Sequence, residues 1–148
     1  MLKMGKTTEI MDTLTELKTQ KIPDNLTAKH LIILYNELHL NSDATALLEQ
    51  VYYGNQSDEE MAEELFFSYV RENKLLKQQN HALSMYKSFN KDVYSQWAVE
   101  SMYLIQTNMK FETRILDIAY LLLLKMMKEP DFKIDQPFAL LFLKILKT

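Results

Sequence analysis

The segment Leu65-Phe-Phe-Ser-Tyr69 decides the fold, because segments of the same kind lie 34 residues before and after it. These are Leu31-Ile-Ile-Leu-Tyr35 and Val99-Glu-Ser-Met-Tyr103. In each segment an aliphatic residue precedes a tyrosine by four positions, a spacing that places both side chains on one face of a helix. Three such helices at one fixed step along the chain indicate an internal repeat of helical units.

Other columns of like residues share the 34-residue step. One column holds acids, one holds tyrosines and two hold mainly aliphatic residues: Asp24, Asp58 and Asp92; Tyr52, Tyr86 and Tyr120; Leu14, Leu48, Ala82 and Leu116; Leu17, Val51, Met85 and Ala119. Thirty-four residues is the length of the tetratricopeptide repeat (TPR), a pair of antiparallel helices A and B that stacks on its neighbours. The repeat is divergent, because Ile32, Phe66 and Glu100 stand where a TPR usually has a small residue.

We expect an all-α fold of antiparallel helix hairpins stacked as a divergent TPR-like right-handed superhelix. Apolar residues recur at three- and four-residue steps, and no long alternating apolar–polar run indicates a sheet. The pattern predicts about eight helices, near residues 7–20, 25–39, 42–53, 58–72, 74–89, 92–107, 111–128 and 136–147. We expect helix N-caps at Ser42, Ser57 and Asp135, because short polar side chains accept hydrogen bonds from the first backbone N–H groups.

The most apolar stretch runs from Ile115 to Met127 and is interrupted by Asp117 and Lys125. It falls short of the roughly 20 apolar residues that a membrane span needs, so we interpret it as a buried helix and expect no membrane association. The first residues lack the apolar core of a signal peptide. The sequence has no cysteine for a disulfide framework, which fits a cytoplasmic protein.

We expect a single TPR-like domain over residues 1–148. Its repeats are predicted as a partial one at 1–23, then 24–57, 58–91 and 92–129, followed by a terminal helix at 130–148. Solenoids normally end in polar caps, but the last helix is apolar and has no helix after it: Leu140, Leu141, Leu143, Ile145 and Leu146. We therefore expect either a section of a longer solenoid or a truncated relative of one, whose uncapped ends could self-associate.

The sequence offers no set of residues for catalysis or cofactor binding. Its histidines, His30, His39 and His81, have no partner at metal-ligand spacing, and no glycine-rich loop could cradle a phosphate. The formal net charge of −3 argues against a DNA-binding protein. We expect a protein that is not an enzyme and needs no cofactor, with a small helical enzyme as the alternative from another class.

Partner-binding residues follow from the repeat geometry, because helix A side chains that avoid the hairpin core face the concave surface of a solenoid. By position these residues are Ile33, Asn36, Phe67, Arg71, Trp97 and Ser101. Trp and Arg are enriched in binding hot spots. The alternative for Phe67 and Trp97 is simple packing between neighbouring repeats.

Two charged runs have alternative readings. The acidic run is either a solvated helix start or a patch for a basic partner: Glu59, Glu60, Glu63 and Glu64. The basic stripe is either solvated or a contact for ribosomal RNA: Lys74, Lys77 and Lys87.

Three consecutive segments carry a family resemblance: Glu64-Leu-Phe-Phe-Ser-Tyr-Val-Arg-Glu72, Lys77-Gln-Gln-Asn-His-Ala-Leu-Ser-Met-Tyr-Lys87 and Phe89-Asn-Lys-Asp-Val-Tyr-Ser-Gln-Trp-Ala-Val99. They resemble the N-terminal portion of the auxiliary, non-catalytic subunit of the NatB N-terminal acetyltransferase. That family has a helix ending in Tyr-x-Arg, a Lys-x-Gln-Gln helix ending in Tyr-Lys, and a Lys-Asn-Pro-Tyr-x-x-Trp-like segment. Here Asp92-Val93 stands in place of the Asn-Pro pair.

The resemblance implies a scaffold that wraps a catalytic N-acetyltransferase subunit and helps to bring it to the ribosome. It also implies that the complex acetylates nascent chains beginning Met-Asp, Met-Glu, Met-Asn or Met-Gln, with acetyl-CoA bound by the catalytic partner. The alternative among binding proteins is a generic TPR adaptor that clamps peptide C-termini in its concave groove. That clamp needs Lys and Asn on successive A helices, a requirement that Asn36 and Arg71 meet poorly.

Overall fold

The computed structural model describes residues 8–13, 16, 25–109 and 115–147, and every regular element in those ranges is a helix. The bounded helices are α2 (Asn25–Glu37), α3 (Asn41–Gly54), α4 (Glu59–Arg71), α5 (Leu75–Phe89), α6 (Asp92–Met109), α7 (Ile115–Met127) and α8 (Gln136–Leu146). Residues 8–13 are also helical, and the rest of the helix expected near 7–20 lies largely outside the described residues. The prediction of an all-α chain of helical hairpins is confirmed.

The chain divides into two compact units, residues 1–51 and 52–148. In the first unit, the buried apolar side chains come from one face of α2 and one face of α3: Ala28, Ile32, Tyr35, Ala44, Leu47 and Leu48. Their spacing of three and four residues gives each helix a single apolar stripe. Tyr35, the first member of the tyrosine column, is 3% exposed and belongs to this core.

Helices α2 and α4 end in the same backbone motif. His39 and Asn73 follow these helices with positive φ angles of 58° and 54°. In each case the next residue donates its N–H to the carbonyl of the column tyrosine, Tyr35 or Tyr69, at 2.8 and 2.9 Å. This is a Schellman motif, which satisfies carbonyl groups that the end of a helix leaves unpaired. Since the two caps are themselves 34 residues apart, the repeat extends to the turns.

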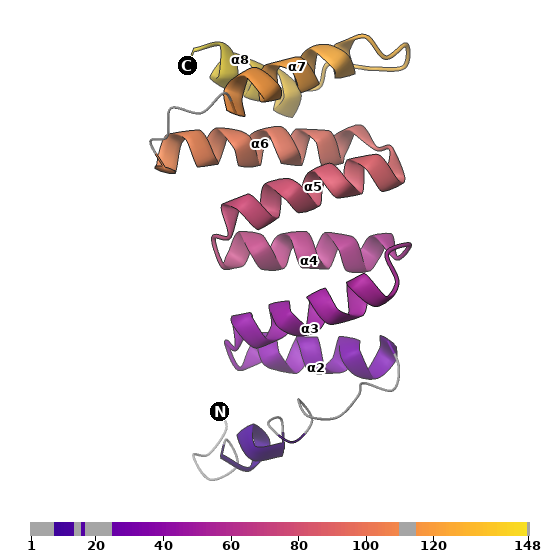
Figure 1. Cartoon of the computed structure of the whole chain (residues 1–148), viewed down its shortest axis with the longest axis vertical. Helices are drawn as coiled ribbons and strands as arrows, with labels where there is room; N and C mark the ends of the chain where they lie inside the picture. Colours follow the sequence, from indigo (N-terminus) through magenta and orange to yellow (C-terminus); the bar gives the residue numbers. More distant parts are fainter. Residues whose placement is uncertain (1–7, 14–15, 17–24, 110–114, 148) are drawn as a thin grey trace. The chain divides into compact units, whose positions relative to one another are not determined.

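In the second unit, consecutive helices pack on one another: α4 on α5, α5 on α6 and α6 on α7, while α8 packs on both α6 and α7. Figure 1 shows α4 to α7 as successive rows whose chain direction alternates. Members of the repeat columns lie in this core: Leu65, Met85, Val99 and Ala119 are fully buried, and Tyr69 is 2% exposed. The columns of these residues therefore mark the core side of the helices, whereas Tyr120, in another column, is 38% exposed.

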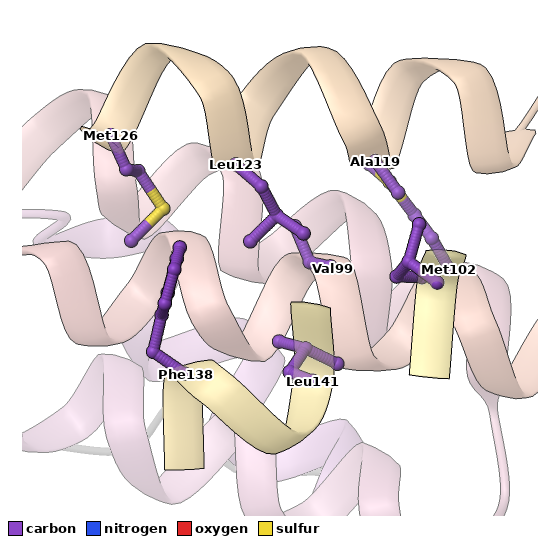
Figure 2. Packing of buried hydrophobic residues seen from close by; sticks show 8 residues of the cluster. Val99, Met102, Ala119, Leu123, Met126, Phe138 and Leu141 are labelled. Carbon is purple, nitrogen blue, oxygen red and sulfur yellow. The ribbon is translucent and has the colours of Figure 1, made fainter. Parts of the chain in front are cut away.

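Helices α6, α7 and α8 share one apolar cluster, made by Val99, Met102, Ala119, Leu123, Met126, Phe138, Leu141 and Ile145. Figure 2 shows the α7 side chains Leu123 and Met126 pointing into the same core as Phe138 of α8. The interpretation of α7 as a buried helix is wrong for its outer face, where Ile118 is 50% and Leu121 63% exposed. None of the described helices has the length and apolar character needed to cross a membrane.

The predicted N-caps are right in one case of three. Asp135 caps α8 by accepting a hydrogen bond from the Phe138 N–H at 2.9 Å. Asp58, not Ser57, caps α4, because its carboxylate accepts a hydrogen bond from the Met61 N–H at 3.1 Å, while the Ser57 hydroxyl donates to the Asn55 side chain at 2.6 Å. Ser42 lies inside α3, which starts one residue earlier, since the carbonyl of residue 40 already accepts a helical hydrogen bond.

Candidate partner-binding surface

One face of α4 projects away from the core and carries Glu60, Glu64, Phe67 and Arg71. The spacing of four, three and four residues keeps these side chains in a single stripe along the helix. Phe67 is 45% exposed, and the other three are also exposed. The opposite face of α4 is buried at Met61, Leu65 and neighbouring core positions, so the outer stripe is fixed by the core packing of the helix.

Trp97 of α6 joins this stripe to the next helix. Its indole stacks on Phe66 with ring centroids 4.6 Å apart and planes inclined by 18°. Phe67 and Tyr94 pack against it in tilted arrangements, with centroids at 5.2 and 5.3 Å. Aromatic pairs of this kind add about 0.5–1.5 kcal/mol beyond area burial, so the indole is held firmly.

A groove of about 370 Å³ lies between α6 and α8, next to Trp97. Its lining mixes apolar, amide and charged side chains: Gln96, Trp97 and Glu100 from α6, and Gln136, Pro137, Leu140, Leu141 and Lys144 from α8. Leu140 is 52% exposed, and Lys144 lies with its ammonium 5.9 Å from the Tyr103 ring centroid. The groove therefore continues the exposed surface of α4 and α6 onto α8.

A polar cluster beneath this surface ties α4 to α6. Tyr94 is fully buried, and its hydroxyl hydrogen bonds to the carboxylates of Glu59 and, at 2.7 Å, Glu63. Lys91 pairs with Glu59 at 2.7 Å. The hydrogen bond from Lys91, followed by that from Tyr94, lowers the pKa of Glu59, whereas burial and then the two carboxylates raise the pKa of the Tyr94 hydroxyl. Two members of the acidic run, Glu59 and Glu63, are thus used within the fold.

The structure brings together three of the six residues predicted for partner binding. Phe67, Arg71 and Trp97 lie on the α4–α6 surface, where Phe67 and Trp97 pack on each other and both remain partly exposed. Ile33, which is 56% exposed, and Asn36, which is partly buried, belong to the first compact unit.

Ser101 is not on the surface. It is fully buried, donates its hydroxyl to the Trp97 carbonyl at 2.7 Å and accepts a hydrogen bond from the Gln78 amide at 2.9 Å. The helical pattern could have shown this, because Ser101 lies in one stripe with the buried residues Tyr94, Ala98 and Ile105. The outward-facing residue at this level of α6 is Glu100, which sequence reasoning missed together with the α8 residues of the groove.

Of the three histidines, His81 has a structural role in the second unit. His81 is 6% exposed, lies edge-on to the rings of Tyr52 and Tyr69, and donates from Nε2 to the Ala62 carbonyl at 2.8 Å. Burial lowers its pKa, so the ring is held neutral. Within the described ranges no three His, Asp or Glu side chains gather as a metal site.

Comparison with known proteins places the chain in a family. The model of the Psidin N-terminal TPR repeats region matches residues 1–148. The mouse and human proteins named N-alpha-acetyltransferase 25, NatB auxiliary subunit, are each 27% identical to the chain over 135 residues, which is 88% of the chain and 14% of the relative. The Phagocyte signaling-impaired protein of Drosophila pseudoobscura pseudoobscura is 30% identical over 102 residues, or 69% of the chain and 11% of that protein.

The chain therefore spans a small part of the length of these relatives. The match covers the same helices from which the resemblance to the NatB auxiliary subunit was inferred, and that resemblance is confirmed at the level of the family. The chain belongs to the family of the Psidin N-terminal TPR repeats region.

Proposed function

We propose that this chain is a non-catalytic scaffold of a NatB-like N-terminal acetyltransferase complex and binds the catalytic subunit. The observation that carries the proposal is the family match over residues 1–148, joined by relatives that are named NatB auxiliary subunit. The exposed surface of Phe67, Arg71 and Trp97 supports it, because a rigid aromatic pair beside an arginine has the composition of a binding hot spot.

The proposal extends to the reaction that the complex performs. The catalytic partner holds acetyl-CoA and acetylates nascent chains that begin with Met followed by Asp, Glu, Asn or Gln. Here the scaffold contributes binding and positioning, and no residue of this chain takes part in the acetyl transfer. We also propose that the scaffold is a single domain of TPR-like repeats, with a partial repeat at 1–23, repeats at 24–57, 58–91 and 92–129, and a terminal helix at 130–148.

Co-expression with a NatB catalytic subunit tests this function. We expect the tagged chain to retain the catalytic subunit and to increase its acetylation of a Met-Asp peptide. Phe67→Ala should weaken retention, whereas Leu76→Ala, which removes a 54% exposed side chain from α5, should leave it unchanged. Failure of the wild-type chain to retain the catalytic subunit, or equal effects of the two substitutions, would contradict the proposal.

Ribosome association in the cytoplasm is a further part of the proposal. Its support is the family membership together with lysines on α5: Lys77, which lies over the Tyr69 ring, and Lys87. We expect the complex to sediment with ribosomes at low salt and to lose this association as salt rises, because phosphate contacts release counterions. Sedimentation that does not depend on salt would argue against the lysine contact.

Self-association is the second candidate interaction, and α8 supports it. Three leucines on its outer side are each about half exposed: Leu140, Leu143 and Leu146 at 52%, 50% and 55%. A helix that is apolar on nearly every side favours a partner on its open face. The mass in solution should rise with concentration, and Leu143→Lys should keep the chain monomeric. A chain that remains monomeric at high concentration would rule this interaction out.

A further inference from the structure

We propose that the groove between α6 and α8 receives an arginine side chain from an extended segment of the partner protein. Its guanidinium would stack on Trp97 and pair with the Glu100 carboxylate. This inference rests on the proposed scaffold function, because it names the chemistry of the partner that the surface would hold. It is argued from the packing of the Trp97 indole, from the Glu100 carboxylate and from the amides that line the groove.

Trp97 presents a pre-formed platform to the groove. Phe66 of α4 stacks on one face of the indole, and Phe67 of α4 and Tyr94 of α6 pack tilted against it. Trp97 is also one of the residues that line the groove toward α8. Trp is the aromatic side chain that attracts cations most strongly over its face. A ring already held by its neighbours loses little freedom when a ligand binds, which favours affinity.

Glu100 supplies the charge that a guanidinium needs. It is exposed, stands three residues after Trp97 on the same side of α6, and has no ion pair in the described part of the chain. The lining of the groove includes one cation, Lys144, whose ammonium lies 5.9 Å from the centroid of the Tyr103 ring. An arginine fits the remaining geometry better than a lysine, because its planar group can stack on an indole while its fork bonds to a carboxylate.

Exposed acids on α4 add negative charge to the wider surface. Glu60 and Glu64 lie on the α4 stripe that also carries Phe67, which packs on Trp97. The groove walls also carry the amides of Gln96 and Gln136, which can donate to and accept from an extended peptide backbone. With about 370 Å³, the groove is near the lower end of ligand pockets, roughly 300–1,000 Å³, and so suits one side chain of an extended segment.

Fluorescence titration of the full chain tests the inference, because Trp97 is the only tryptophan in the sequence and reports directly on the groove. The probes are three acetylated and amidated peptides, Ala-Leu-X-Leu-Ala, in which X is arginine, its neutral isostere citrulline, or glutamate. We expect a saturable change with the arginine peptide and about tenfold weaker binding of the citrulline peptide, equivalent to about 1.4 kcal/mol. Glu100→Gln should weaken binding of the arginine peptide by a similar factor, and Glu129→Gln, an exposed acid beyond α7, should not.

Each other outcome overturns the inference. Equal binding of arginine and citrulline peptides would remove the role of charge, and preference for the glutamate peptide would show that Lys144 makes the groove an anion site. Absence of a saturable signal with any peptide, or equal effects of Glu100→Gln and Glu129→Gln, would exclude the groove. The scaffold function is judged separately. If Glu100→Gln weakens peptide binding but the chain still retains the catalytic subunit, the scaffold function stands and the groove is not needed for it.

Discussion

Leu123 lies at the centre of the core that holds α8 against α6 and α7, and its replacement should loosen one wall of the groove. The side chain is fully buried and belongs to the same cluster as Val99 and Phe138 (Figure 2). Leu123→Ala removes buried methyl groups from a site where three helices meet. We expect the substitution to lower the free energy of unfolding of the second unit.

The size of this loss follows from the surroundings of Leu123. Leu→Ala substitutions in protein cores cost about 2–5 kcal/mol, depending on how far the site can collapse around the cavity. The outer face of α7 is exposed at Ile118 and Leu121, so α7 can move toward α6 and α8 and fill part of the space. We therefore expect a cost of about 3 kcal/mol, in the lower half of that range.

Urea unfolding followed by Trp97 fluorescence measures this cost in the unit that contains the tryptophan. Leu121→Ala on the same helix is the matched control, because Leu121 is 63% exposed and its removal should cost less than about 0.5 kcal/mol. The reasoning fails if Leu121→Ala costs as much as Leu123→Ala. It also fails if Leu123→Ala leaves the urea midpoint of the tryptophan signal unchanged.

The other predictions concern the histidine, a turn and a helix cap. Because burial lowers the pKa of His81, the unfolded chain binds a proton at this histidine from about pH 6.5 downward, and the folded chain does so only at lower pH. In urea titrations the free energy of unfolding should therefore fall from about pH 7.5 to 5.5. His81→Gln should flatten this dependence. Asn73→Ala should cost about 1 kcal/mol and Asn73→Gly should be near neutral in thermal unfolding, since φ is 54°; equal effects would argue against the left-handed cap. Asp135→Ala should cost about 1 kcal/mol in the same measurement, and Asp135→Asn should recover most of it.

The sequence was sufficient to predict the helices between residues 25 and 147 and many of their core positions. Residues such as Leu65, Met85 and Val99 recur with the period that a stacked hairpin requires, and burial follows from this period without knowledge of the partner helix. The helix ends at His39 and Asn73 were harder to see, because the sequence has no glycine there. Asn and His also tolerate the left-handed region, and their 34-residue separation was the available signal.

The groove could not be predicted in the same way. Its walls come from residues 96–100 and 136–144, which meet only because α8 packs on α6 as well as on α7. The contact between α6 and α8 depends on tertiary packing, so the spacing of residues within either helix does not predict it. The prediction of Ser101 as a surface residue, in place of Glu100, was a different kind of error. Tyr94, Ala98 and Ile105 form a helical stripe that indicates the buried side of α6, and Ser101 lies in that stripe.

The acidic run at the start of α4 illustrates how one segment serves both the fold and the surface. Glu59 and Glu63 are four residues apart and turn toward α6, where they bond to Tyr94, while Glu60 and Glu64 share the outer stripe with Phe67. The inner pair anchors the helix beside Trp97, and the outer pair gives the neighbouring surface its negative charge. A net-charge count cannot separate these roles, but a helical period can. The inner pair, by bonding to Tyr94, therefore fixes the helix on which the outer pair presents its charge to a basic partner.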